Sequence, residues 1–201
     1  MGPVGLQDEE VSVTAAVPVK ARRRTGNEIV SRKWRSEVMT WSRARGQVLR
    51  GAYGEELLRY KARDLDGHPG RWTVEDLDVV LLEVFPAKVI VESEDEFDTV
   101  LEEVKAFLLF MAETGRLHPD SDDPETLCLH LDGLAPIFQV RMADPSRYAW
   151  GKRMVLVMAR DGVKANDEKA VDAWMARFNA LPLAEQAALL DSFAGSGSPV
   201  G

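Results

Sequence analysis

The chain has 201 residues, 45% of them hydrophobic, and a formal net charge of −8 at pH 7. This length fits one domain of ordinary size, and this composition can bury a core, which argues against wholesale disorder. The single cysteine, Cys128, excludes an intrachain disulfide framework and a zinc site made of cysteines alone, and it indicates a reducing compartment. No apolar run approaches the roughly 18 residues of a membrane span, and the N-terminus lacks the features of a signal peptide. We therefore expect a soluble, cytoplasmic protein without a membrane partner.

Positive charge is concentrated near the N-terminus. Residues 20–50 contain ten Lys or Arg and only two acids, a local net charge of +8, so the rest of the chain carries −16. Such an asymmetry predicts a binding partner without naming it.

The two ends of the chain differ in composition from the middle. Residues 1–25 mix Gly, Pro and charge without helical or strand periodicity, which predicts a disordered arm. Residues 195–201, GSGSPVG, are typical of a flexible tail. We expect residues 26–194 to form a single helical domain.

The first half of this domain shows three helical segments. The first is predicted from a cap at Asn27 to about Ala44, and the second from about Gln47 to Arg63. A third follows an N-cap at Thr73, and Pro86 is expected to end it.

The next predicted helix opens with a capping box, Ser93 with Glu96, and ends at Gly115. Its centre, FLLFM, is apolar on nearly all sides, which predicts the most buried helix of the fold. The residues expected at the centre of the core are Phe97, Leu101, Val104, Leu108 and Met111.

The later segments are marked by capping residues and prolines. Asp123–Pro124 and Asp144–Pro145 each combine a cap with proline at the first helical position, while Gly133 and Pro136 are expected to break or sharply kink the helix between them. Asn166 and Pro182 introduce two further helices. With no convincing strand, the pattern predicts an all-α fold, an orthogonal bundle of about eight helices with a disordered basic N-terminal arm.

Two stretches carry a resemblance: WTVEDLDVVLLEVFPAKV at 72–89 and the segment from DPSRYAW to AALL at 144–190. Together they resemble an uncharacterised all-helical domain found in proteins of high-GC bacteria, in which a W-T-x-E helix ends in proline and D-P-S-x-x-W and W-x-x-x-F-N helices follow. The resemblance covers roughly residues 70–193 and leaves out the basic segment. It implies an all-α fold and no activity.

The residues give little support for catalysis. Cys128 and His130 lie two residues apart on one helix and point in roughly opposite directions, so they form no local nucleophile–base pair. Cys128 is expected to be an inert, buried small residue. We predict no catalytic residue, and a non-enzymatic role is favoured while scattered catalytic groups stay possible.

Cofactor motifs are also incomplete. The acidic loop HPDSDDPE at 118–125 offers oxygen ligands, yet it lacks the order of an EF-hand and is typical of a solvated loop with an N-cap. Gly46, Gly51 and Gly54 are not followed by the lysine of a phosphate-binding loop. We predict no metal and no cofactor.

The aromatic and basic residues of the basic segment need separate explanations. Trp34 and Trp41 are seven residues apart, so they share a helical face, and packing on the core is favoured over stacking on bases. The cations fall on the arm or on the wet face, and they are our candidates for partner or nucleic-acid binding: Arg22, Arg23, Arg24, Arg32, Lys33, Arg35, Arg43 and Arg45.

Three functions are compatible with the sequence. The basic segment docks on an acidic protein surface, either the chain's own body or another subunit, as part of an interaction or adaptor module. Alternatively, residues 20–50 bind the phosphates of nucleic acid, or the fold holds an enzyme without a recognisable motif. The sequence favours the interaction module, with nucleic acid as the alternative.

Overall fold

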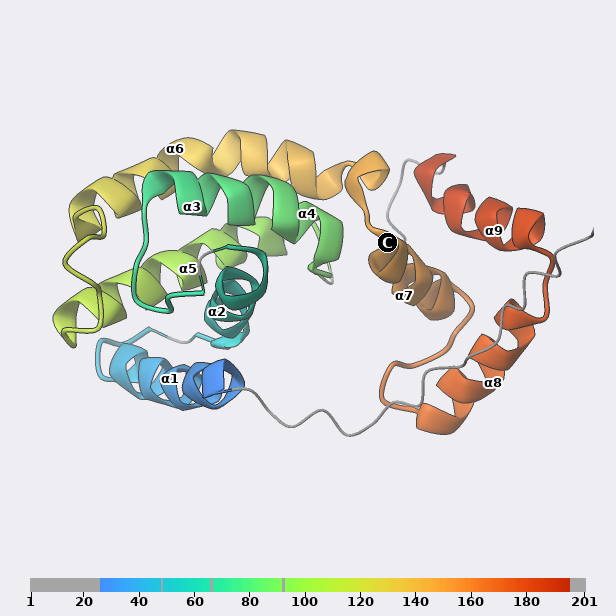
Figure 1. Ribbon diagram of the computed structural model, residues 1–201, viewed down its shortest axis with the longest axis horizontal. Helices are drawn as coiled ribbons and strands as arrows, with labels where there is room; N and C mark the ends of the chain where they lie inside the picture. The colour runs from blue at the N-terminus through green and yellow to red at the C-terminus, as the bar shows by residue number, and fades with distance from the viewer. Residues whose placement is uncertain (1–25, 48, 66, 92, 196–201) are drawn as a thin grey trace, which may run out of the picture.

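The computed structural model describes residues 26–195 except 48, 66 and 92, and all regular structure in this part of the chain is helical. The predicted all-α class is confirmed (Figure 1). Arg22, Arg23 and Arg24, with the rest of the predicted arm, lie outside the described residues. The elements are α1 (Gly26–Arg43), α2 (Ala52–Asp64), α3 (Val74–Asp78), the π-helical η1 (Val79–Val84), α4 (Phe85–Lys88), α5 (Glu96–Glu113), α6 (Pro124–Ala143), the 3₁₀-helical η2 (Pro145–Arg147), α7 (Trp150–Arg160), α8 (Glu168–Asn179) and α9 (Leu183–Gly195).

The larger of two hydrophobic clusters is built by α1 to α6 around α5. Helix α5 contacts α1, α2 and α6, which lie around it in Figure 1. The residues predicted to centre the core are all buried, which confirms that prediction: Phe97, Leu101, Val104, Leu108 and Met111. Gly115 ends the helix in the left-handed conformation, φ 66°, as the sequence predicts. None of the described helices is long and apolar enough to cross a membrane.

A buried carboxylate fixes the beginning of α2. Glu103, only 2% exposed, accepts hydrogen bonds from the backbone N–H groups of Arg50 at 2.5 Å, Gly51 at 3.1 Å and Tyr53 at 3.3 Å. Gly51 has φ 67°, and a Cβ there would lie 2.9 Å from Met39. The predicted start near Gln47 is therefore wrong, because the chain reaches helical geometry only after this left-handed turn.

Pro86 does not end its helix, so that prediction is wrong. A proline lacks an N–H and crowds the carbonyl four residues back, here that of Leu82. The chain widens into the π-helical η1 just before it, where Phe85 N bonds to the carbonyl of Val80, five residues back. The Leu82 carbonyl accepts instead from Arg141 Nη1 at 3.1 Å. The helix therefore continues to Lys88.

Helix α6 runs from its Asp123 cap through Gly133 and Pro136, so the predicted break is wrong. The carbonyl that Pro136 leaves without a helical donor belongs to Asp132, which is exposed and open to water. A proline on the wet side of a helix costs less than one whose orphaned carbonyl is buried.

Two predicted caps are displaced. Helix α5 begins after Asp95 without a side-chain cap: the Glu96 N–H bonds to the Ser93 carbonyl at 3.2 Å and not to the hydroxyl, and the Glu96 carboxylate pairs with Arg50 at 2.7 Å. Helix α8 is capped by Asp167, one residue after the predicted Asn166, and its carboxylate accepts from the backbone of Ala170.

A smaller cluster lies within α7 to α9, at the other side of Figure 1. Trp174 stacks on Phe178 with ring centroids 5.2 Å apart, and Leu190 of α9 completes the contact. The predicted single domain thus contains two separate groups of buried residues among the described ones.

The two clusters are joined at the end of α4. Its last carbonyls have no helical donor, and α7 supplies donors: Ala149 N lies 2.9 Å from the Ala87 oxygen, and Lys152 Nζ 2.9 Å from the Pro86 oxygen. Arg153 ties α7 to α9 through Asp191 at 2.9 Å. Polar contacts therefore carry much of this junction.

Candidate functional site

The inner face of α1 belongs to the core. Trp34 lies against Phe107 with ring centroids 6.3 Å apart, and Trp41 against Phe110 at 6.0 Å. Val38, between them, is buried. The prediction that both tryptophans pack on the core is confirmed, so neither ring is free to stack on a base.

Two of the predicted cations are tied to acids of the same chain. Arg35 pairs with Glu55 of α2 at 3.1 Å, while Arg45 pairs with Glu113 of α5 and lies over the Trp41 ring at 4.1 Å. Acidic residues elsewhere in the same chain therefore neutralise part of the positive charge of residues 20–50.

Three other predicted cations remain on the outer surface of α1. Arg32, Lys33 and Arg43 are exposed and form no ion pair with the described residues. Arg32 and Arg43 are three turns apart, so they share one face of the helix. The candidate residues thus form no single patch, and Arg22, Arg23 and Arg24 lie outside the described chain.

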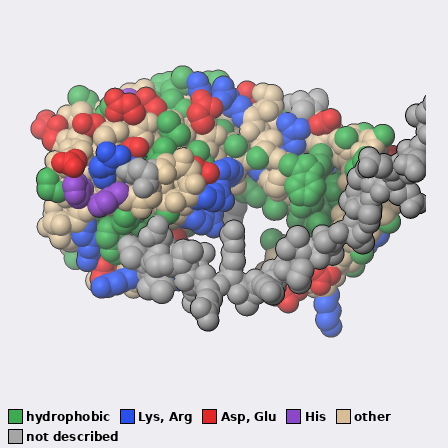
Figure 2. All heavy atoms as spheres, viewed as in Figure 1, with side chains coloured by type: hydrophobic (Ala, Val, Ile, Leu, Met, Phe, Trp, Pro, Cys, Tyr) green, Lys and Arg blue, Asp and Glu red, His purple; other side chains and the backbone are tan. Residues whose placement is uncertain are grey.

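A different set of cations lines a groove between α2, residues 88–90 and α7. It consists of two neighbouring cavities, of about 330 and 420 Å³, which share Tyr60, Lys88 and Ile90. Figure 2 shows Lys and Arg side chains on the wall of the hollow between the two parts of the molecule. We call this the basic groove, and its charged and tyrosine side chains are Arg50, Tyr53, Glu56, Arg59, Tyr60, Arg63, Lys88 and Lys152.

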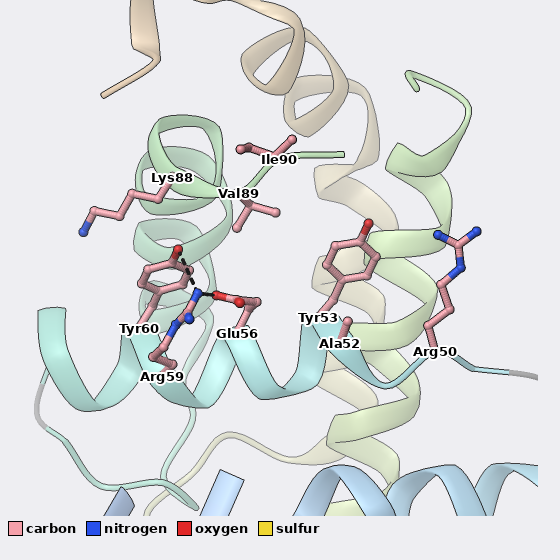
Figure 3. A pocket seen from close by; sticks show the side chains of 9 residues that line it. All are labelled: Arg50, Ala52, Tyr53, Glu56, Arg59, Tyr60, Lys88, Val89 and Ile90. Carbon is pink, nitrogen blue, oxygen red and sulfur yellow. Dashed lines mark hydrogen bonds and ion pairs between the residues drawn. The ribbon is translucent and has the colours of Figure 1, made fainter. Parts of the chain in front are cut away.

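The first cavity has cations at both ends. In Figure 3, Arg59 lies beside Glu56 and the Tyr60 hydroxyl, and Arg50 stands at the opposite end beyond Tyr53. Arg59 pairs with Glu56, and its second contact, to the Tyr60 hydroxyl, is 3.4 Å. The exposed guanidinium groups and the half-buried Lys88 surround a rim that an anion could approach.

The basic groove carries a net positive charge, although the net charge of the whole chain is negative. Five cations and one acid, Glu56, line the two cavities, and Glu96 and Asp64 pair with lining cations from outside them. Counting these two acids as well, the local charge is still +2. Anions near the groove are therefore attracted over about a Debye length, although the whole chain is negative.

Two tyrosines lie among the cations of the groove, and the ring of Tyr60 contacts three of them. The Tyr60 ring has the charged groups of Arg59, Arg63 and Lys88 within 5.0–5.3 Å of its centroid. Burial raises the pKa of Tyr60, although Arg59 and Arg63 oppose the rise. For Tyr53, burial first and then the nearby carboxylates raise the pKa to about 12. Both phenols are therefore neutral hydrogen-bonding groups at pH 7.

The sequence alone did not indicate this groove. Its cations are spread over residues 50, 59, 63, 88 and 152, so no local run of charge marks them. A partial signal existed in α2, where Arg59 and Arg63 are one turn apart and flank Tyr60.

Where the structure describes them, the histidines and the cysteine do not gather into another site. His68 and His118 lie edge to face at 4.7 Å, and His130 contacts Asp78 at 2.8 Å. No group of three or more His, Cys, Asp or Glu that could hold a metal occurs among the described residues. Cys128 is partly buried, and burial raises its pKa, which fits the expected low reactivity.

Comparison of the chain with models of known families, with curated proteins and with solved structures gave no match. The resemblance over residues 70–193 therefore stays a prediction. The geometry of the groove is the basis for assigning a function.

Proposed function

We propose that the protein is a non-enzymatic helical interaction module that binds an acidic protein segment in the basic groove. The observation that supports the proposal is the concentration of five cations around two adjoining cavities in a chain of net charge −8. Apolar side chains such as Ile90, 40% exposed, lie between the cations. A segment that alternates acidic and apolar residues matches this lining.

The exposed cations of α1 have a supporting role in this proposal. Arg32, Lys33 and Arg43 lie outside the groove and point positive charge into solvent. Exposed charges outside a contact act mainly on the rate and direction of approach. The basic N-terminal segment thus steers the partner, and the groove holds it.

An acidic protein is a better match than nucleic acid, which is the alternative. Sequence-tolerant binding of single strands relies on exposed aromatic rings, whereas the rings that line the groove, those of Tyr53 and Tyr60, are buried. A long phosphate chain would also extend over the acidic body and be repelled there.

The proposal is tested by neutralising the groove. In the groove variant, Arg50, Arg59 and Lys88 are replaced by Gln; in a matched control, the exposed Lys164, Lys169 and Arg177 are replaced by Gln, so both lose three positive charges. Binding is measured by fluorescence anisotropy with a labelled peptide of alternating Glu and Ala, at low and high salt. A labelled single-stranded DNA of equal length is the second probe.

We expect the wild-type protein and the control to bind the peptide more weakly as salt increases. The groove variant should lose about tenfold in affinity, which corresponds to about 1.4 kcal/mol over three exposed cations. Equal binding by the groove variant and the control would refute the groove as the site. Tighter binding of the DNA than of the peptide would favour the alternative function.

A further inference from the structure

Lys152 is a buried cation with no acidic partner in the described part of the chain. It is 6% exposed, and it forms no ion pair with the described residues. Its Nζ donates one hydrogen bond, to the Pro86 carbonyl at 2.9 Å, and lies 3.8 Å from the centroid of the Tyr148 ring. An ammonium has three N–H donors, so two find no acceptor among the residues that the structure describes.

The surroundings compensate only part of this charge. The end of α4 supplies the negative end of a helix dipole, equivalent to about half an elementary charge. The Tyr148 ring adds a cation–π contact. Burial nevertheless lowers the pKa of Lys152 to about 8, and no carboxylate opposes this effect. At pH 7 the amine is still mostly protonated, so a charge remains that lacks a counter-ion.

Lys152 also lines the larger cavity of the basic groove, of about 420 Å³. Arg63 and Lys88 line the same cavity, and no acidic side chain does. The remaining lining is Tyr60 together with small or apolar residues: Ala87, Ile90, Ala149, Gly151 and Val155. The cavity therefore combines an excess of positive charge with room for a short apolar group.

We propose that this cavity is a carboxylate-binding site in which Lys152 is the counter-ion and Arg63 and Lys88 attract the ligand at the rim. A carboxylate carries the single charge that Lys152 lacks and accepts several hydrogen bonds. Its stem should be short and apolar, because the rest of the lining is.

The same carboxylate chemistry can come from two sources. One is a free short-chain carboxylic acid, which needs nothing from the proposed interaction function. The other is an acidic side chain of the partner segment, which rests on that function. Lys152 would then select where an acidic residue of the partner lies in the groove.

The test follows the titration of Lys152 itself by NMR of ¹³C-labelled lysine side chains. The probes are butyrate, a neutral-ended peptide with one central Glu among alanines, and inorganic phosphate. The exposed Lys164 is the internal control. Lys152→Gln keeps a donor for the Pro86 carbonyl but removes the charge, and Lys164→Gln is its matched control.

Saturating butyrate should raise the pKa of Lys152 by about one unit, which corresponds to about tenfold tighter binding to the protonated amine. The pKa of Lys164 should not move, and Lys152→Gln should lose butyrate binding. An unchanged Lys152 pKa, or unchanged butyrate binding by Lys152→Gln, would overturn the site. A pKa that responds to phosphate but not to butyrate would show that the ligand class is wrong.

The two proposals fail separately. If the alternating Glu and Ala peptide binds and the Lys152 pKa responds to no probe, the carboxylate site is refuted and the interaction function stands. If butyrate raises the pKa and that peptide does not bind, the cavity is a small-acid site and the interaction function is refuted. A response to the single-Glu peptide assigns the acidic side chain as a ligand.

Discussion

The two hydrophobic clusters of this chain are stabilised in different ways. The cluster of α1–α6 contains 25 buried residues, whereas that of α7–α9 contains five. The first has a central helix, α5, that is covered on several sides. The second depends on one aromatic stack and on polar contacts at the end of α4. The groove lies where the two clusters meet, so its shape depends on the smaller cluster as well as on the larger one.

The largest expected effect is in the core of the first cluster. Leu108→Ala should lower the free energy of unfolding by about 2–5 kcal/mol, because Leu108 is fully buried and leaves a cavity. Leu190→Ala, in the small cluster, should cost about 1–2 kcal/mol, since fewer neighbours surround it. Urea titration of both variants measures the difference.

The control for this pair is Leu129→Ala. Leu129 is 71% exposed, so its loss should stay within about 0.5 kcal/mol. Equal losses at Leu108 and Leu190 would mean that the two clusters contribute alike.

The next largest effect is a pH dependence of stability caused by Lys152, which lies where α7 meets the end of α4. The pKa of Lys152 is about 8 in the folded protein and 10.5 in the unfolded chain, so the unfolded state binds more protons between these values. Stability should therefore rise from pH 8 towards 10.5, by on the order of 3 kcal/mol in total. Tyr53, with its pKa raised to about 12, has the opposite effect at higher pH, and so do Cys128, Tyr60 and Tyr148, whose pKa values burial also raises.

Urea midpoints between pH 7 and 11 should thus rise above pH 8, pass through a maximum at about pH 9–10 and then fall. Lys152→Met should be more stable than the wild type at pH 7 and should lack the rise. A wild-type profile that is flat from pH 8 to 10 would contradict the unpaired, buried state of Lys152.

A smaller effect is expected where α5 fixes the beginning of α2. Glu103→Gln should cost about 1–3 kcal/mol, because an amide group replaces a carboxylate that accepts three backbone hydrogen bonds. Hydrogen exchange of Gly51 and Tyr53 should become faster, while α8 stays as protected as before. Faster exchange over all helices would show that Glu103 affects the whole fold instead.

The smallest effect is expected at the exposed link between α7 and α9. Asp191→Asn removes the ion pair with Arg153, in which Asp191 is 67% exposed, and should change stability by less than about 1 kcal/mol. The change should vanish at high salt. A loss of several kcal/mol in a thermal melt would show that this single contact holds α9 in place.

Much of the fold could be predicted because helical periodicity and capping are local properties. The buried stripe of α5 and the Asp123 cap were both correctly predicted. The errors at Pro86 and Pro136 have a common cause. The energetic cost of a proline within a helix depends on whether the carbonyl four residues before it finds another hydrogen-bond donor. Arg141 satisfies the Leu82 carbonyl, whereas the carbonyl freed by Pro136 belongs to an exposed residue, Asp132. The local sequence shows neither the donor for the Leu82 carbonyl nor the exposure of Asp132.

The candidate site was less predictable. The sequence shows how many cations residues 20–50 contain. Whether a given cation can bind a partner depends on acids far along the chain, such as Glu113, which pairs with Arg45. The groove combines cations from segments up to about a hundred residues apart, such as Arg50 and Lys152. Only the packing of α7 against the end of α4 brings them together.

Pro86 and the end of its helix at Lys88 determine whether this helix could be transplanted into another protein. The carbonyls of Leu82, Pro86 and Ala87 are satisfied by α6 and by the start of α7. This helix is therefore not a self-contained unit that could be transplanted, since removing its neighbours would leave three acceptors to be hydrated. The proline frees the Leu82 carbonyl for α6, and the end of the helix frees those of Pro86 and Ala87 for α7, so this helix is bound to both neighbours.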